Sequence, residues 1–205
     1  MRKGQATREK LMDIAEAAVL SKGFGATSIE EIIAEAEITK SGFFYHFKDK
    51  NELARALLER HIRNDDTILD GVFARARQLH DDPLHAFLIG LKLLSELLDD
   101  MPNGHPGCLV ATYCYNERLF DQDVRDLNRQ AVVRWRMRFL KVIEEIAAIY
   151  PPRLDVNLTD VADMVSNTVE GGIIMSKTLK EPRVLGAQIL LLHSYMKLLF
   201  LTPQN

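Results

Sequence analysis

Apolar residues recur at helical spacing along almost the whole 205-residue chain. In the first segment, Leu11, Ile14, Ala15, Ala18 and Val19 follow the i, i+3, i+4, i+7 and i+8 positions of an amphipathic helix, which predicts a helix over residues 7–21. No segment shows the alternating pattern of a β-strand. The sequence therefore predicts an all-α fold of about nine helices. The further helices are expected at residues 28–36, 40–47, 50–79, 83–98, 108–119, 121–150, 158–179 and 183–201.

Helix start signals divide the stretch from Thr27 to Lys50 into two short helices and the beginning of a third. Thr27 followed by Glu30 has the spacing of a capping box. Thr39 is placed to cap the second short helix, and Asp49 with Glu52 repeats the box before the long third helix. The turn between the short helices contains Glu37, so a non-glycine residue either accepts a positive φ there or alters the turn.

The second short helix has two different faces. Phe43 and Phe47 lie four residues apart and share an apolar face. The opposite face carries polar and aromatic side chains, as the second helix of a helix-turn-helix requires. In a major groove, Lys40 can donate to a guanine edge or a phosphate, Phe44 can contact a thymine methyl, and Tyr45 can reach a phosphate. The outward residues are Lys40, Ser41, Phe44 and Tyr45.

The helix pattern suggests two functional domains. A three-helix helix-turn-helix unit is expected at residues 1–50 and a C-terminal helical bundle at residues 80–205, joined by a long helix at 50–79. The last helix is apolar on more than one side, and the preceding helix contains Gly171-Gly172, which lets another helix come close. The last two helices therefore predict a homodimer through a four-helix bundle. The alternative is that both helices are central in a monomeric bundle.

Composition excludes several classes of protein. The formal net charge of -3 argues against indiscriminate nucleic-acid binding, so any DNA contact depends on local basic patches and on salt. The polar start and the absence of a long apolar run predict no membrane association and a cytoplasmic location. No cluster pairs a nucleophile with a base, and none has the ligands of a metal or cofactor site, so we expect no enzyme activity.

The two cysteines allow two interpretations. Cys108 and Cys114 are six residues apart, so on one helix they face different sides and an intrachain disulfide is not expected. They are either small buried apolar residues or a redox sensor whose oxidation releases DNA.

The N-terminal residues resemble the tetracycline-repressor (TetR/AcrR) family of bacterial transcription factors. The resemblance covers residues 7–60, and the sequence departs from the family pattern at Glu37, where glycine is usual. The matching positions are Thr27, Ser28, Ile32, Tyr45, His46, Phe47 and Lys50.

The resemblance implies further site residues. Ser28, Thr39 and Lys50 would hold phosphates, and His46 matches a position that often contacts DNA, although it equally fits a role in tying down the end of its helix. A small-molecule pocket is implied in the C-terminal bundle. Its candidate residues are Tyr113, Asn116, Trp135 and Glu170.

These observations predict a ligand-responsive DNA-binding regulator, a repressor released from a palindromic operator by a small-molecule effector. Its expected partners are duplex DNA, the effector and a second copy of the chain. Two alternatives remain: a DNA-binding regulator controlled by a protein partner or by cysteine oxidation, and a helical binding module that no longer reads DNA.

Overall fold

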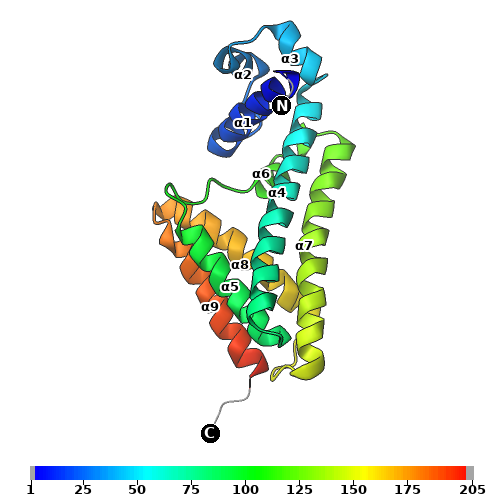
Figure 1. Cartoon of the computed structure of the whole chain (residues 1–205). Helices are drawn as coiled ribbons and strands as arrows, with labels where there is room; N and C mark the ends of the chain where they lie inside the picture. Colours follow the sequence, from blue (N-terminus) through cyan, green and yellow to red (C-terminus); the bar gives the residue numbers. More distant parts are fainter. Residues whose placement is uncertain (1–2, 202–205) are drawn as a thin grey trace. The chain divides into compact units, whose positions relative to one another are not determined.

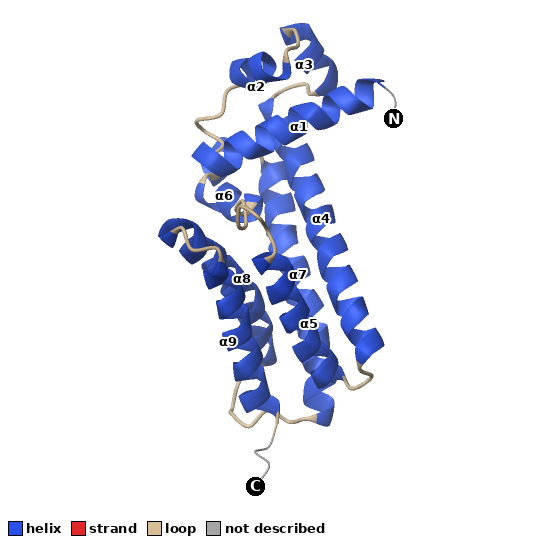
Figure 2. Ribbon diagram, turned by 60° about the vertical axis from the view of Figure 1, so that its left-hand side comes forward, coloured by secondary structure: helices blue, strands red, loops and turns tan. Residues whose placement is uncertain are grey.

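The computed structural model describes residues 3–201, and every regular element within them is helical (Figures 1 and 2). The predicted all-α class is therefore confirmed for these residues. None of their helices has both the length and the apolar composition that a bilayer span requires. The elements are α1 (Lys3–Lys22), α2 (Ile29–Ala36), α3 (Lys40–His46), α4 (Lys50–Leu79), α5 (Pro83–Asp99), α6 (Leu109–Tyr115), the 3-10 helix η1 (Glu117–Leu119), α7 (Gln122–Ile149), α8 (Leu158–Leu179) and α9 (Arg183–Phe200).

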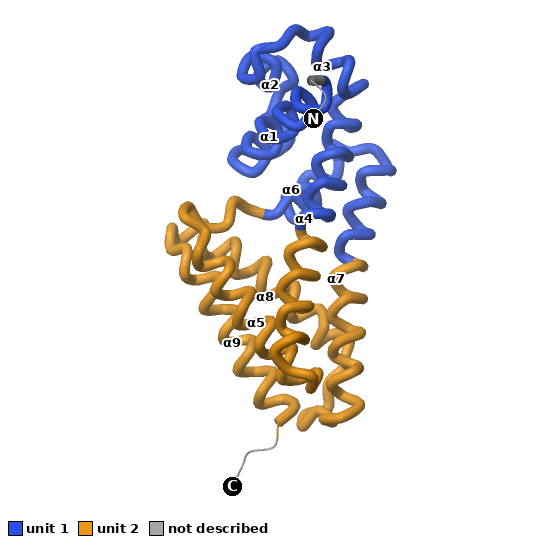
Figure 3. The backbone as a smooth tube through the Cα atoms, in the orientation of Figure 1, with its two compact units in different colours: residues 1–64, 108–132 blue, residues 65–107, 133–205 orange. Residues whose placement is uncertain are grey.

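The chain packs into two compact units (Figure 3). Unit 1 comprises residues 1–64 and 108–132, and unit 2 comprises residues 65–107 and 133–205. Helices α4 and α7 each contribute their first part to unit 1 and their remainder to unit 2. The predicted functional division, with a DNA-binding domain at 1–50 and a ligand-binding and dimerisation domain at 80–205, is a different division and stays a prediction.

The cap of α2 differs from the prediction by one residue. Ser28, not Thr27, has the extended backbone of an N-cap, and its hydroxyl accepts a hydrogen bond from the amide of Glu31. Thr27 is buried, and its hydroxyl donates to the carbonyl of Gly23 at 2.9 Å. The capping box from Thr27 to Glu30 is therefore wrong, because burial turns the threonine hydroxyl toward the chain before it.

The turn between α2 and α3 accepts a strained residue. Glu37 lies in the left-handed region, with φ 58° and ψ 42°, and its N–H bonds to the carbonyls of Ala34 and Ile33. A non-glycine residue in this region costs about 1 kcal/mol. Of the two outcomes considered for Glu37, the structure has the first: the residue takes the positive φ and the turn is kept.

The predicted caps of α3 and α4 are confirmed. Thr39 accepts a hydrogen bond from the amide of Gly42 at 3.1 Å. At the start of α4, Asp49 accepts from the amide of Glu52 at 2.9 Å, and the Glu52 carboxylate accepts from the amide of Lys48 at 2.6 Å. Side chains thus satisfy the free amides at both helix starts, which fixes where each helix begins.

An aromatic cluster joins α6 to the core of unit 1. The ring of Phe24 lies 5.8 Å from that of Tyr113 and 4.5 Å from that of Phe120. The Tyr113 hydroxyl, which is buried, donates to the carbonyl of Ala54 in α4 at 3.0 Å. Residues 108–132 are therefore held in the same core as the N-terminal helices.

A charged cluster holds α4 against α1. The guanidinium of Arg60 donates to Asp13 at 2.6 Å and to Glu9 at 3.2 Å, and it also pairs with Glu16. The Arg60 side chain is only 14% exposed, so these carboxylates compensate a largely buried charge.

In unit 2, α9 packs side by side with both α5 and α8 (Figure 1). Small residues permit the close approach. A Cβ added at Gly186 of α9 would lie 2.3 Å from the Asp99 carboxylate, and one added at Gly172 of α8 would lie 2.7 Å from the Leu185 side chain. Gly172 therefore serves packing within the chain, whereas a Cβ at Gly171 would meet nothing within 4 Å.

Asp82 is the N-cap of α5 and stabilises the start of this helix. Its carboxylate accepts from the backbone amide of His85 at 2.9 Å, the His85 ring at 2.7 Å and the Tyr150 hydroxyl at 2.7 Å. Burial alone would raise the pKa of Asp82, but these hydrogen bonds outweigh burial and lower the pKa from 3.8 to about 2.

We expect Asp82→Asn to remove a pH-dependent part of the stability. Because the folded-state pKa is depressed and one pH unit corresponds to about 1.4 kcal/mol, the carboxylate contributes about 2 kcal/mol above pH 4. That contribution is lost as the pH falls from about 4 to about 2. Urea unfolding of the parent and of Asp82→Asn at pH 7, 4 and 2.5 measures it. Asp81→Asn, a change at the exposed neighbour, is the control and should differ little from the parent.

Candidate nucleic-acid interface

Helix α3 presents aromatic side chains on its outer face. Phe43 and Phe47 are fully buried, whereas Phe44 is 43% exposed and Tyr45 is 82% exposed. Since Phe43 anchors one side of the helix, its neighbours in sequence are turned away from the core. The structure places Phe44 and Tyr45 where the sequence predicted an outer face.

Polar groups lie beside these rings at the N-terminus of α3. Lys40 is exposed and its ammonium lies 3.4 Å from the carboxylate of Glu30 on α2. The hydroxyls of Thr39 and Ser41 are 3.0 Å apart. A backbone hydrogen bond and the contact with Lys40 lower the pKa of Glu30. An exposed ion pair of this kind contributes little free energy, so a phosphate or a base can replace Glu30 as the partner of Lys40.

The remaining predicted contacts lie at helix ends. Ser28 and Thr39 are the N-caps of α2 and α3, and both are exposed. The ring of His46 is half-buried and meets the Tyr45 ring edge-on at 5.0 Å. This contact fits both roles considered for His46, since the ring supports Tyr45 and remains partly accessible.

Lys50 has a structural partner. Its ammonium donates to the carbonyl of Phe24 at 2.7 Å and lies 4.2 Å from the centroid of the Phe24 ring. Burial lowers the pKa of Lys50. An ammonium has three donors, so the bond to Phe24 does not use all of them. The phosphate contact of Lys50 stays a prediction.

The predicted ligand residues are divided between the two units. Tyr113 is buried and bonded to Ala54, and Asn116 donates to the carbonyl of Thr112, both within unit 1. Trp135 and Glu170 are half-buried in unit 2. None of the four predicted residues lines either of the two cavities described below. Their ligand role stays a prediction.

The described residues contain two cysteines and a group of possible metal-ligating side chains. Neither cysteine forms a disulfide within the part of the chain that the structure describes: Cys108 is buried, with its sulfur 3.9 Å from Nε2 of His61, and Cys114 is exposed. The interpretation of two buried cysteines therefore holds for Cys108 alone. His80, Asp82 and His85 offer possible ligand atoms within 4.8 Å of one another, a group that the sequence prediction missed.

Comparison with known proteins agrees with this geometry. Residues 11–57 match the model of the bacterial regulatory proteins of the tetR family. An HTH-type transcriptional regulator in the lacX 3′ region of Lactococcus lactis is 25% identical over 87% of this chain and 87% of its own length. The HTH-type transcriptional repressor NemR of Escherichia coli K12 is 36% identical over 27% of this chain and 28% of its own length. A TetR transcriptional regulator from Chloroflexus aurantiacus J-10-FL shares the fold, with a TM-score of 0.77 and 22% identity over 98% of both chains.

The matched residues contain α2, α3 and the start of α4, which carry the proposed DNA-contacting side chains. The relatives that match are transcriptional regulators, not enzymes. The buried phenylalanines, the exposed aromatic face of α3 and these similarities lead to one conclusion: residues 11–57 form an N-terminal domain of the bacterial tetR regulatory family, and the chain shares the fold of TetR regulators.

Proposed function

We infer that this regulator binds a roughly palindromic operator as a homodimer and represses transcription until a small molecule releases it. The observation that carries the proposal is the exposed face of α3, where Tyr45 and Phe44 lie beside Lys40 on a helix anchored by Phe43. Exposed aromatic rings that are grouped beside a cation, rather than scattered singly, are typical of a surface that binds another molecule.

Each group on this face has a partner in duplex DNA. Lys40 can donate to O6 and N7 of a guanine, and the Phe44 ring can lie against a thymine methyl. The Tyr45 hydroxyl and the exposed caps Ser28 and Thr39 can bind phosphates. Phosphate contacts position the helix and base contacts select the sequence, so the two kinds of contact can be separated by experiment.

A homodimer would supply the second reading helix. Two recognition helices in successive major grooves require a spacing of about 34–36 Å. Exposed apolar side chains on α8 and α9 support a subunit interface there, since such side chains gather where another protein binds. They are Ile174, Met175, Leu179, Leu190, Leu191 and Leu198.

A small molecule would control the dimer through the C-terminal bundle. Such a ligand would bind better to a dimer whose reading helices are too far apart to enter successive major grooves. It would therefore lower the affinity for the operator, and the coupling free energy between the two binding sites is typically about 1–3 kcal/mol. The relative NemR is a repressor by name, which supports repression as the outcome here. Such a protein would act in the cytoplasm, where the DNA is.

We expect Tyr45→Ala to weaken DNA binding about tenfold, for an operator selected from random duplexes and for an unrelated duplex alike, because it removes a phosphate contact. Lys40→Gln should weaken binding to the operator more than binding to the unrelated duplex if Lys40 touches a base. Fluorescence anisotropy at several salt concentrations measures both changes. A lysine that touches only phosphate would instead reduce the salt slope by about 0.9.

The matched control is Lys141→Gln, a change of an exposed lysine in α7. It should bind the operator like the parent. If Tyr45→Ala and Lys40→Gln also bind like the parent, α3 is not the reading helix. If the parent selects no duplex at all, the alternative of a helical module that does not read DNA is favoured.

A further inference from the structure

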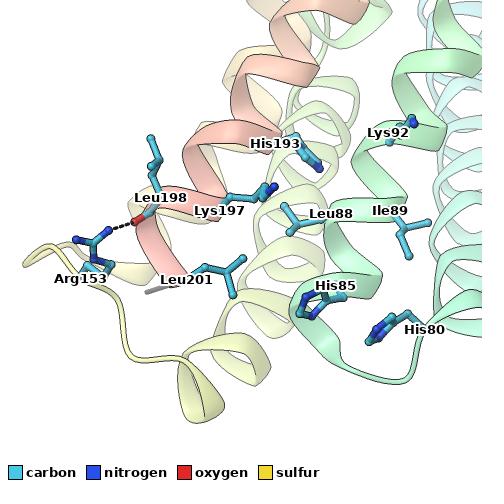
Figure 4. A pocket seen from close by; sticks show the side chains of 10 residues that line it. All are labelled: His80, His85, Leu88, Ile89, Lys92, Arg153, His193, Lys197, Leu198 and Leu201. Atoms are coloured by element: carbon cyan, nitrogen blue, oxygen red, sulfur yellow. Dashed lines mark hydrogen bonds between the residues drawn. The ribbon is translucent and has the colours of Figure 1, made fainter. Parts of the chain in front are cut away.

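Unit 2 contains a cavity of about 770 Å³ whose wall comes from the α4–α5 loop, the N-terminal part of α5, the α7–α8 loop and the C-terminal part of α9 (Figure 4). Its size lies within the range of about 300–1,000 Å³ that is usual for small-molecule sites. None of the predicted DNA-binding or ligand residues lines it. The cavity therefore needs an explanation of its own.

Basic side chains surround this cavity. They come from α5 and the loop before it on one side and from α9 on the other, and Arg153 in the α7–α8 loop donates to the carbonyl of Leu198 (Figure 4). No aspartate or glutamate is among the lining residues. The basic lining residues are His80, His85, Lys92, Arg153, His193 and Lys197.

The positive charge at the cavity is only partly compensated. His85 pairs with Asp82, which is not among the lining residues. His193 is half-buried. Its pKa is lowered mainly by burial, and also by the nearby positive charges of Lys197 and Lys92. An anion between these groups would replace repulsion among like charges by attraction.

A second cavity in unit 2, of about 870 Å³, provides the contrast. It also carries basic residues, but most of these are paired: Arg138 with Asp66 at 2.8 Å and with Asp70, and Arg77 with Glu145. Three carboxylates in its own wall thus offset most of the charge of its four basic side chains. Only the first cavity presents cations that lack carboxylates in the same wall.

The wall of the first cavity is otherwise apolar. Leu88 is buried beneath the basic groups, between α5 and α9 (Figure 4). Ile89, Leu198 and Leu201 extend the same apolar surface. A hydrated inorganic anion would leave this surface without a partner, whereas a hydrocarbon group would cover it.

A bound cation is the competing interpretation for one corner of the cavity. The ligand atoms of His80, Asp82 and His85 are close enough to share an ion. However, both carboxylate oxygens of Asp82 already accept hydrogen bonds, and the imidazoles are stacked with their planes 19° apart. Lone pairs in nearly parallel ring planes do not converge on one ion, and the lysines nearby would repel it.

The geometry points to a binding site for an organic anion that has one anionic head group and a hydrocarbon tail, such as a fatty carboxylate or an alkyl phosphate. The head group would lie between Lys92 and Lys197, and the tail on Leu88 and its apolar neighbours. The site lies on side chains of unit 2 alone and does not depend on DNA binding.

Calorimetric titration of the full chain with octanoate, well below its micelle concentration, tests the proposal. We expect one saturable site per chain. Acetate, which lacks the tail, and octanol, which lacks the charge, should each bind at least about tenfold more weakly. Octyl phosphate, titrated in parallel, shows which head group the site prefers, and a single saturable site for either anion supports the proposal.

Variants locate the site. Lys92→Gln and Lys197→Gln should each weaken octanoate and octyl phosphate about three- to tenfold, because each removes a charge-assisted contact. Lys141→Gln, in the charge-paired cavity, should leave the affinity unchanged. The proposal is overturned if neither anion saturates, if octanol binds as well as octanoate, or if Lys92→Gln and Lys197→Gln bind both anions like the parent.

Discussion

Replacing Phe43 by alanine should lower the free energy of unfolding of unit 1 by about 3–5 kcal/mol, the range for removing a large aromatic side chain from a core. Phe43 is fully buried and its ring lies 5.8 Å from that of Phe47. The cavity left by the missing ring would remove the packing that holds α3 against the core. Because domains are stable by only about 5–15 kcal/mol, operator binding should be lost at moderate temperature as well.

The neighbouring phenylalanine is the matched control for this change. Phe44 is 43% exposed, so Phe44→Ala should reduce stability by less than about 1 kcal/mol while weakening operator binding. Urea unfolding followed by circular dichroism measures stability, and anisotropy measures DNA binding. Equal destabilisation by both changes would contradict the proposed orientation of α3.

Placing a charge at Leu191 should convert the proposed dimer to monomers. Leu191 is 64% exposed on α9, so Leu191→Glu costs the single chain little. In a subunit interface the same carboxylate would be buried without a partner, which costs several kcal/mol. We therefore expect the dimer dissociation constant to rise by at least about a hundredfold and operator binding to fall with it.

Sedimentation equilibrium at several protein concentrations measures this dissociation constant. Val133→Glu is the control, since Val133 is also exposed and apolar but lies on α7, outside the proposed interface. A parent chain that is monomeric throughout, or a Leu191→Glu chain that dimerises like the parent, would favour the alternative of a monomeric bundle.

Local signals were strong enough to predict most of the fold. The apolar periodicity gave most of the helices, and α5 begins at Pro83, the first residue of the predicted range, with Asp82 as its N-cap. The caps Thr39 and Asp49 were predicted because a capping hydrogen bond joins residues only two or three positions apart. The outer face of α3 followed from the four-residue spacing of its two buried phenylalanines.

Other features depend on residues that are far apart in the sequence. The sequence could not show that Thr27 would be buried or that Lys50 would donate to the carbonyl of Phe24. Nor could it show that Arg60 would form ion pairs with three carboxylates of α1. The predicted ligand residues were chosen by type along single helices, and the structure divides them between two units. Which charges are left uncompensated in a cavity is likewise a property of the packed chain.

The sequence by itself determined most elements of this protein: its longer helices, the caps of α3 and α4, and the two faces of α3. These follow from hydrogen bonds and apolar stripes within a few residues. Only the tertiary structure decided which residue caps α2 and which basic side chains surround the cavity between α5 and α9. Burial and charge compensation decide such features, because both depend on neighbours that the folded chain brings together.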